Sequence, residues 1–410
     1  MPIAVRRIAM VSMHTSPNEQ PGSVDSGGMN VAILETALAL AARGIEVDLL
    51  TRAVKSPAVT HLAPGVTLHE LACGGRGRLP KSQLTELTDD FGEAVANLTG
   101  RVRSRYDLIH AHYWLSGLAS LPVALELSLP FVQSFHTIAA MKNQTLAPGQ
   151  APEGEQRTRT EMFLANQASA IVAASAAEVS SLIDDLRAPP ERIWVIPPGA
   201  DIALFHPSRA DDAGRRIRNL LGIDPDRPVI TIAGRVQPLK GQDLAIRVLA
   251  KMHEGAVRPV FVIAGEATPG DEKYAASLRA TATQFGVHDS LRFTGPLPRQ
   301  RLADLFAASA LTLVPSLSET FGLVAIESAA SGTPVIAFRG GGLIDSVADG
   351  SSGILIDSRD ATVWATTICS LLADPARLEQ LGVSARQHAE RFTWPATATA
   401  LIGLYSSLVR

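Results

Sequence analysis

The sequence predicts an α/β protein built from two doubly wound, Rossmann-like domains that face an interdomain cleft. Strand-like apolar runs alternate with helical patterns along the chain, and the alternation restarts after a stretch rich in Pro, Asp and Arg at residues 197–216. Continuous apolar strands that alternate with helices indicate a parallel sheet covered on both faces. The 410 residues are too many for one hydrophobic core and suit two or three domains.

The first half is predicted to form a parallel sheet with helices between its strands. The stretch Met29–Ala42 is expected to be one of these helices, because its apolar residues recur at helical spacing. The strands are expected at Ile8–Ser12, Val47–Thr51, Val66–Leu71, Leu108–Ala111, Phe131–Phe135, Ala170–Ala173 and Ile193–Ile196.

The second half repeats this pattern after residues 197–216, a stretch without a sustained period that is interpreted as a linker. Its strands are expected at Val229–Ala233, Val260–Ala264, Leu291–Thr294, Leu311–Val314, Val335–Ala337 and Ile354–Ile356. Ligands of such sheets gather at the carboxyl ends of the strands, so two halves joined by a linker would enclose a cleft between them.

The composition excludes several classes of protein. Hydrophobic residues make up 46% of the chain and charged residues 19%, which suits a compact enzyme rather than a disordered chain. The net charge of −3 gives no reason to expect a nucleic-acid partner. Cys73 and Cys369 lie far apart, so we expect neither a zinc site nor a disulfide. No segment has the roughly 20 apolar residues that a membrane span needs, and we expect a cytoplasmic protein.

The loop after the first strand ends in two adjacent glycines before a predicted helix. Gly27 and Gly28 would let the backbone approach a ligand, and the helix N-terminus would offer N–H groups to an anion. Asn30 and His14 are candidate side-chain donors. The alternative is a tight turn whose helix is capped by Ser26. The loop lacks the G-x-G-x-x-G pattern of dinucleotide-binding folds.

Two further motifs follow strands of the first half, HAHYWLSG at residues 110–117 and FHTIAAMKN at residues 135–143. They place polar side chains where an open parallel sheet presents its functional loops. His110 and His112 could bind a metal, but no further ligands stand at suitable spacing. Histidines that make hydrogen bonds in the core are the alternative that we favour. The polar side chains are His112, Tyr113, His136, Thr137 and Lys142.

The second half carries GRVQPLKG at residues 234–241, directly after its first strand. Arg235 and Lys240 place two cations in a glycine-flanked loop between a strand and a helix. Such a loop suits a diphosphate, whose leaving-group charge the cations would neutralise. The motif is not a Walker A loop, which needs Gly-Lys-Ser/Thr at the start of the helix. The alternative is a surface charge pair.

The most specific motif is PSLSETFGLVAIESAASGTPVIA at residues 315–337, followed by a glycine turn at 340–342. Glu319 and Glu327 are eight residues apart, just over two helical turns, so both carboxylates could face one cleft. The backbone at residues 321–323 would offer N–H groups to a phosphate, and Glu327 could accept hydrogen bonds from a ribose diol. The alternative is a pair of solvated carboxylates on a helix.

Taken together, these motifs resemble the retaining family-4 glycosyltransferases of GT-B fold. The second half of that family carries a GR…KG loop, two glutamates eight residues apart around FG, then SGTPV and GG, and all of these stand between Gly234 and Gly342. The resemblance covers nearly the whole chain. It implies an acceptor-binding domain at residues 1–200, a nucleotide-sugar-binding domain at 201–393 and a C-terminal helix at 394–410 that packs back on the first domain.

The resemblance is closer to one group of family members. The strings SMHTSP, DSGGMNV and HYWLSG and the pattern HT-x-A-x-x-KN are similar to those of hexosyltransferases that move N-acetylglucosamine from UDP-N-acetylglucosamine to 1D-myo-inositol 3-phosphate, the first step of mycothiol biosynthesis. A phosphate on a small polyol needs a compact cationic pocket. Without the resemblance, Arg157 would be interpreted as part of a solvated helix face. The implied acceptor contacts are His14, Asp25, Ser26, Gly27, Gly28, Met29, Asn30, Lys81, Tyr113, Thr137 and Arg157.

On the donor side, Leu297 stands in RFTGPLP where the family often has Arg near the uracil, and a backbone contact there would leave the function intact. We expect no obligatory cofactor beyond the nucleotide-sugar cosubstrate and no metal site, although magnesium could bind the phosphates. The resemblance implies that His136, Arg235, Lys240 and Glu319 are catalytic. The implied donor contacts are Gln20, Pro21, Gly28, Arg235, Lys240, Leu297, Glu319, Phe321, Gly322, Leu323 and Glu327.

We expect a front-face transfer with retention, in which Arg235, Lys240 and helix N–H groups stabilise the leaving diphosphate and His136 supports the donor sugar. One alternative is a related transferase that uses another nucleotide sugar, such as a GDP-octose, on a thiol or aminocyclitol acceptor in antibiotic biosynthesis. Others are a sugar-phosphate synthase of the same fold and a binding protein without turnover. The expected partners are small molecules, without nucleic acid or membrane insertion, and the resemblance implies a homodimer.

Overall fold

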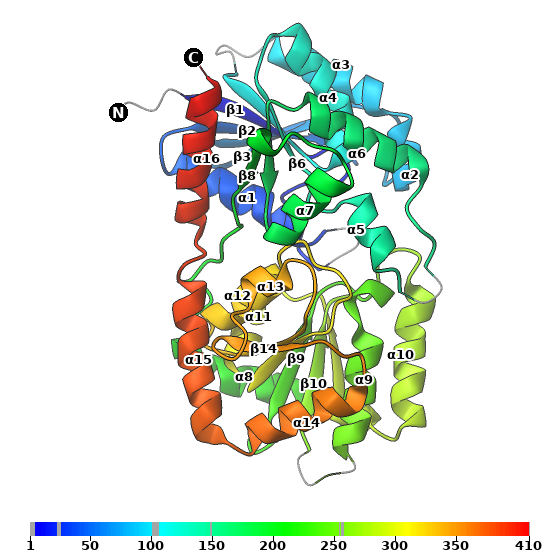
Figure 1. Cartoon of the computed structure of the whole chain (residues 1–410), viewed down its shortest axis with the longest axis vertical. Coiled ribbons are helices and arrows are strands. Elements are labelled where there is room, and N and C mark those ends of the chain that lie inside the picture. Colours follow the sequence, from blue (N-terminus) through cyan, green and yellow to red (C-terminus); the bar gives the residue numbers. More distant parts are fainter. Residues whose placement is uncertain are drawn as a thin grey trace.

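The structure, a computed structural model, describes residues 5–22, 26–100, 106–147, 150–253, 255 and 258–409. In this part of the chain two sheets lie one above the other, each surrounded by helices (Figure 1). The paired strands of both sheets run parallel, apart from β3 (Ala58–Ala63), which pairs antiparallel with β4 (Val66–Leu71) at an edge. The prediction of two doubly wound halves is confirmed.

The first half forms the larger sheet, in the strand order β3-β4-β2-β1-β5-β6-β7-β8 among the described residues. Its other strands are β1 (Arg7–Val11), β2 (Glu46–Arg52), β5 (Leu108–His112), β6 (Phe131–Ser134), β7 (Ala170–Ala173) and β8 (Ile193–Val195). Its helices are α1 (Gly28–Ala41), α2 (Lys81–Thr85), α3 (Thr88–Thr99), α4 (Trp114–Glu126), α5 (Ala139–Gln144), α6 (Glu155–Gln167) and α7 (Ala176–Asp184).

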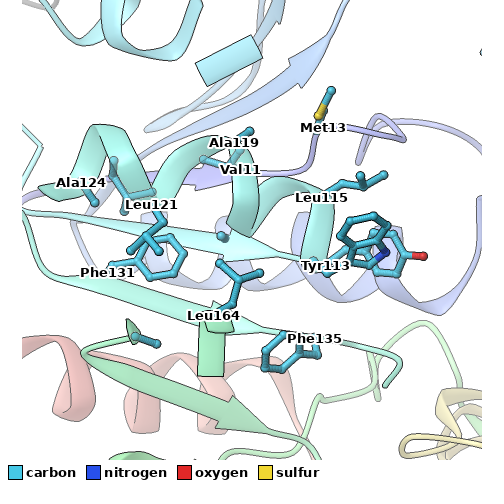
Figure 2. Close-up of a cluster of buried hydrophobic side chains, with 14 of the residues drawn as sticks. Val11, Met13, Tyr113, Leu115, Ala119, Leu121, Ala124, Phe131, Phe135 and Leu164 are labelled. Carbon is cyan, nitrogen blue, oxygen red and sulfur yellow. The ribbon is translucent and has the colours of Figure 1, made fainter. Parts of the chain in front are cut away.

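The central strands of the first sheet, β2, β1, β5 and β6, are buried on both faces, as their apolar runs predict. On one face, Val11 and Phe131 of the sheet pack with Leu115 of α4 and Leu164 of α6 (Figure 2). On the other face, the cluster contains residues of α1 and of the C-terminal helix α16 (Trp394–Leu408). The two covered faces leave the loops at the carboxyl ends of the strands as the places where ligands can bind.

The second half forms a sheet in the order β11-β10-β9-β12-β13-β14. Its strands are β9 (Val229–Ala233), β10 (Val260–Ala264), β11 (Leu291–Gly295), β12 (Leu311–Val314), β13 (Val335–Phe338) and β14 (Gly353–Ile356). Its helices are α8 (Asp212–Leu221), α9 (Gln242–His253), α10 (Glu272–Gln284), α11 (Arg299–Ala307), α12 (Leu323–Ala330), α13 (Leu343–Ser346), α14 (Ala361–Leu372) and α15 (Pro375–Ala389), with 3-10 turns at Pro207–Arg209, Pro238–Lys240 and His288–Ser290. Another 3-10 turn, Pro190–Arg192, precedes β8 in the first half.

The strand order of each sheet reverses next to its first strand. In the first sheet the reversal falls between β1 and β5, and in the second it falls between β9 and β12. Open α/β sheets bind their ligands in the crevice at such a reversal. The loops after these four strands carry four of the five motifs that the sequence singles out, and the fifth, FHTIAAMKN, follows the neighbouring strand β6.

The chain crosses between the halves twice, and the two crossings lie side by side. The N–H of Ala200 donates to the carbonyl oxygen of Phe392 at 3.0 Å, and Ala200 forms a parallel bridge with Thr393. After the second crossing, α16 returns to the first half, where Leu401 and Tyr405 join the cluster that contains β1 (Figure 1). The domain boundaries at residues 200 and 393 stay predictions.

Three local expectations were wrong. The strand β3 was not predicted, because it is an exposed edge strand without a buried face to pattern it. Helix α8 begins inside the expected linker, and its apolar period was hidden because Ile217 is surrounded by arginines. Ser26 does not cap α1: Gly27 is the N-cap, and the Ser26 hydroxyl donates instead to the carbonyl of Glu19 at 3.2 Å.

Candidate active site

The loops of the two halves meet at the carboxyl ends of their sheets. The hydroxyl of Thr320, before α12, donates to the carbonyl of His136, after β6, at 2.5 Å. The N–H of Glu266 donates to the carbonyl of Gly22 at 3.3 Å. These contacts place the motifs of the first half opposite those of the second.

The glycine loop before α1 faces the second half directly. A Cβ atom on Gly27 would lie 3.5 Å from Nε of Arg235, and one on Gly28 would lie 3.3 Å from Leu323. The loop is fixed by Asn30, which is 1% exposed: its Oδ1 accepts from the N–H of Gly27 at 3.1 Å, and its Nδ2 donates to Thr15 Oγ1 at 2.9 Å. Asn30 thus has a scaffolding role in this loop. Asp25 lies outside the described residues.

Tyr113 forms the centre of a cationic cluster in the first half. Its ring lies 4.4 Å from that of His14, 5.0 Å from the guanidinium carbon of Arg157 and 5.9 Å from Nζ of Lys81. The body of Tyr113 belongs to a buried hydrophobic cluster, and its hydroxyl points away from that cluster (Figure 2). Burial raises the pKa of this phenol, so Tyr113 is a neutral hydrogen-bonding group.

Arg157 of α6 is a buried, paired cation and not part of a solvated helix face. Its Nε lies 2.7 Å from Glu161, its Nη1 lies 3.1 Å from Glu153, and its Nη2 donates to both the carbonyl and the hydroxyl of Thr137 at 3.0 and 3.1 Å. Burial alone would lower the pKa of Arg157, but Tyr113 and the two carboxylates outweigh it and raise that pKa. Arg157 and Thr137 are therefore held as one unit.

His110 and His112 of β5 and His136 after β6 form two separate sets of hydrogen bonds. His112 Nδ1 lies 2.8 Å from His136 Nε2, and His110 lies 2.7 Å from the hydroxyl of Tyr405 and 2.9 Å from that of Ser134. The interpretation of His110 and His112 as hydrogen-bonding core histidines is confirmed. Burial lowers the pKa of His136 to about 4 and that of His110 to about 3, so both rings are neutral at pH 7.

A cavity of about 70 Å³ lies behind these histidines, toward α7 and α16. Glu178 of α7 lines it together with His112 and His136. Oε2 of Glu178 accepts from the N–H of Ala174 at 2.7 Å, and no other partner is found for Oε1 in the described structure. Burial raises the pKa of Glu178 to about 7.

Two residues of the site have backbone conformations that side chains rarely adopt. Tyr113 has φ 75° and ψ 155°, and His136 has φ 59°. Strain of this kind is tolerated where the surroundings fix a residue, and it is common at functional sites. Tyr113 directly follows β5, and His136 follows β6 after Phe135, so both residues lie at the carboxyl ends of neighbouring strands.

The charged loop of the second half pairs a lysine with a glutamate. Nζ of Lys240 lies 2.6 Å from Oε1 of Glu319, and the same oxygen accepts from the hydroxyl of Ser316 at 2.8 Å. Glu319 lies in the loop before α12, so its eight-residue spacing to Glu327 is not a helical repeat, and that part of the prediction was wrong. The glycine turn explains the close packing, because a Cβ on Gly341 would lie 2.4 Å from the carbonyl oxygen of Glu319.

Glu327 is a buried carboxylate on α12 and not a solvated one. Its Oε1 lies 2.9 Å from Nη1 of Arg299, and its side chain is 6% exposed. Burial raises the pKa of Glu327, while Arg299 opposes that rise. The carboxylate therefore has one charged partner in place and a buried position in the middle of α12.

The remaining donor candidates lie around these groups. Gln20 and Pro21 precede Gly22, which contacts Glu266 of the second half. Phe321 is buried against Phe392 at a ring distance of 5.4 Å, so its backbone alone can face a ligand. Gly322 is the N-cap of α12 and has φ 97°. Leu323 begins the helix, and Leu297 packs against a buried cluster of the second half.

Comparisons with known proteins agree with this geometry. A family model described as "Glycosyl transferase 4-like domain" matches residues 27–199, and one described as "Glycosyl transferases group 1" matches residues 214–388. D-inositol 3-phosphate glycosyltransferases from Segniliparus rotundus and Corynebacterium efficiens are 41% and 40% identical over 99% and 98% of this chain and over 90% and 95% of their own lengths. The chain belongs to the group 1 glycosyltransferases.

Solved structures share the fold of this glycosyltransferase. A sucrose-phosphate synthase from Thermosynechococcus elongatus matches with a TM-score of 0.89 and 30% identity, over 98% of this chain and 99% of its own. HepE from Anabaena, in complex with UDP and glucose, matches with a TM-score of 0.79 and 20% identity, over 98% of this chain and 100% of its own. The predicted GT-B fold is confirmed.

Sequence reasoning missed several residues of the glycosyltransferase that shape its site. Glu153 and Glu161 stand four residues before and after Arg157, and that spacing is a signal for ion pairs. Thr320 and Arg299 gave no comparable signal, because their partners lie far away in the sequence. Of the helices that the structure describes, none combines the length and the apolar character that crossing a membrane requires.

Proposed function

We propose that this glycosyltransferase moves N-acetylglucosamine from UDP-N-acetylglucosamine to 1D-myo-inositol 3-phosphate, with retention at the anomeric carbon. The names of its relatives support the acceptor. The observation that carries the proposal is the cluster in which Lys81 and Arg157 flank the ring of Tyr113 beside Thr137. Two cations with two hydroxyl groups match the oxygens of one phosphate monoester.

The acceptor phosphate binds on the first half. Arg157 supplies a fixed charge, since its carboxylate partners hold the guanidinium in place, and Lys81 reaches the same position from an exposed helix end. Tyr113 and Thr137 supply hydroxyl groups. The polyol ring then lies between this cluster and the second half, where one of its hydroxyls can reach the donor sugar.

The donor diphosphate binds on the second half. Arg235 and Lys240 neutralise its charge, and the N–H groups at the first turn of α12 add the positive end of a helix dipole. Glu319 keeps Oε1 on Lys240 and Ser316 and uses Oε2 for a sugar hydroxyl. Glu327 accepts hydrogen bonds from the ribose diol.

The chemical step exchanges one bond at the anomeric carbon. The bond from that carbon to the β-phosphate oxygen breaks, and the electron pair leaves with UDP under the pull of Arg235 and Lys240. The acceptor hydroxyl oxygen attacks from the same face, and its proton passes to the departing phosphate oxygen. His136 is neutral at pH 7, so it serves as a hydrogen-bonding support for the sugar rather than as a cation.

Incubation of the purified enzyme with UDP-N-acetylglucosamine and inositol 3-phosphate tests the proposal, with mass spectrometry to detect products. We expect glycosylated inositol phosphate and UDP in equal amounts. The parallel reaction with unphosphorylated inositol should proceed far more slowly. Turnover only with another pair, such as a GDP-sugar and an aminocyclitol, would contradict the proposal. The homodimer and the cytoplasmic location stay predictions.

A further inference from the structure

Arg299 is the first residue of α11, and its contacts reach α1 of the first half, α12 of the second half and Phe205, which follows the first crossing. Its Nη1 lies 2.9 Å from Oε1 of Glu327, and its Nη2 lies 3.6 Å from Oε1 of Glu35 on α1 of the first half. Its guanidinium carbon lies 5.2 Å from the centre of the Phe205 ring. One planar cation thus connects a carboxylate of each half over an aromatic face.

Arg299 affects the pKa of both carboxylates that it contacts, Glu327 and Glu35. Burial raises the pKa of Glu327 and that of Glu35, and in both cases Arg299 is the charge that opposes the rise. Asp201, in the crossing segment, repels both carboxylates and raises their pKa further. A single guanidinium therefore favours the charged form of a buried carboxylate, against the burial and the acidic groups that favour its protonation.

We infer that Arg299 is a positioning residue for the ribose of the nucleotide, an inference that rests on the proposed donor site. Arg299 binds Oε1 of Glu327 and leaves Oε2 directed to the 2′- and 3′-hydroxyls. An ionised carboxylate only accepts hydrogen bonds, so both hydroxyls can donate to it, whereas a protonated one would have to donate to one of them. Arg299 acts through Glu327 and does not itself touch the nucleotide.

The geometry of the second contact separates this role from a purely structural one. Nη2 of Arg299 forms no hydrogen bond in the described structure, and its 3.6 Å distance to Glu35 is that of a loose ion pair. Glu35 is therefore a control: Glu35→Gln removes the charge contact between the halves but leaves the contact between Arg299 and Glu327. If Arg299 only held the halves together, the variants at residues 35 and 299 would behave alike.

The test compares two ligands that differ only at the ribose, UDP and 2′,3′-dideoxy-UDP, by calorimetric titration of the full chain. For Arg299→Gln we expect about 10-fold weaker binding of UDP, the size of a lost charge-assisted contact, and unchanged binding of dideoxy-UDP. Glu327→Gln should give the same pattern. Glu35→Gln should bind both ligands like the wild type, and Arg299→Lys should recover part of the loss for UDP alone.

An equal loss for both ligands in Arg299→Gln, or no loss for either, would overturn the inference. If Arg299→Gln does not fold, as judged by thermal unfolding, Arg299→Lys decides by the same comparison, because it keeps the charge but loses the planar fork. Failure of the proposed function would look different: the wild type would not glycosylate inositol 3-phosphate, while its preference for UDP over dideoxy-UDP would still depend on Arg299.

Discussion

The site has two cationic walls, one around Arg157 in the first half and one around Lys240 in the second half. The two walls are held in place by different kinds of contact. The side chain of Arg157, in the first half, is 7% exposed and contacts two carboxylates as well as the carbonyl and hydroxyl of Thr137. The side chain of Lys240, in the second half, is 21% exposed and pairs with Glu319. Arg157 is part of a buried network, whereas Lys240 stands where solvent reaches it.

This difference indicates that the charge of each wall has a different role. A buried network fixes the geometry of a pocket before the ligand arrives, and removal of one member leaves the others as unpaired buried charges. A partly exposed lysine contributes little to folding, so its charge is available to the leaving group in the transition state. Changes in the first wall should thus affect stability and acceptor binding, and changes in the second should affect the rate.

The largest effect is expected for Lys240→Ala. Because charge develops on the diphosphate as it leaves, kcat should fall by about 10²–10³-fold with any acceptor, while thermal stability stays near that of the wild type. Steady-state kinetics and thermal unfolding measure both. Lys273→Ala, on the exposed surface of α10, is the matched control and should keep the wild-type rate. Normal turnover by Lys240→Ala would remove the distinction between the walls.

Arg157→Ala should weaken both the pocket and the fold. We expect the KM for inositol 3-phosphate to rise by about 10–100-fold with little change in the donor KM, since a charge-assisted contact to the phosphate is lost. The unpaired Glu161 should lower the free energy of unfolding by about 3–5 kcal/mol. Arg159→Ala is the control, because Arg159 lies on the same helix with its side chain 75% exposed. Equal changes in both KM values would speak against the phosphate pocket.

Glu178→Gln sharpens the comparison, because Glu178 is a buried carboxyl without the counter-charge that Glu161 has. The pKa of Glu178 is raised from 4.5 to about 7. Below pH 4.5 the Glu178 carboxyl is protonated in both the folded and the unfolded wild type. Between pH 4.5 and pH 7 the unfolded chain releases the proton of Glu178 before the folded protein does. The free energy of unfolding of the wild type therefore falls over this interval, and above pH 7 it stays at the lower value. The variant lacks this loss.

Relative to the wild type, the free energy of unfolding of Glu178→Gln should therefore rise by about 3 kcal/mol between pH 4 and pH 8. Urea unfolding at the two pH values measures the difference. The buried histidines also affect stability in acid, but they are common to both proteins and cancel in this comparison. Parallel pH profiles for the two proteins would show that Glu178 is not held as the structure indicates.

The smallest effect is expected where the two walls touch. Thr320→Val removes the hydrogen bond to the carbonyl of His136, and we expect kcat to fall by about 2–10-fold, the value of one neutral hydrogen bond. Thr320→Ser keeps the hydroxyl and should restore the rate. If Thr320→Val has the same kcat as the wild type, this hydrogen bond does not position His136.

The sequence predicted the sheets well where strands are continuously apolar. The ranges of β4, β7, β9, β10 and β12 agree with the predicted ones at both ends. Four of these strands are mainly apolar and largely buried, whereas β4 alternates apolar and polar residues. Edge strand β3 and helix α8 were not predicted, because exposure in β3 and the charged residues of α8 hide the hydrophobic period. Local pattern thus predicts buried elements better than elements at the rim.

The site was predictable in part. The motifs after β1, β5, β9 and β12 pointed to loops that the structure brings together, because strand ends of a parallel sheet gather at one edge. Arg157 was assigned by resemblance alone, and its burial depends on Tyr113, more than forty residues away in the chain. The spacing of Glu319 and Glu327 misled because the first of them precedes the helix. Contacts such as Arg299 with Glu35 follow only from the assembled fold.

The paired crossings at Ala200 and Thr393 also determine how the molecule can move. We expect two connections joined by a backbone hydrogen bond to act as a double hinge, which would permit rotation about a single axis and resist twist and sliding. Opening for product release would then be a swing in one plane. If either connection were cut, the direction of this opening motion would no longer be fixed.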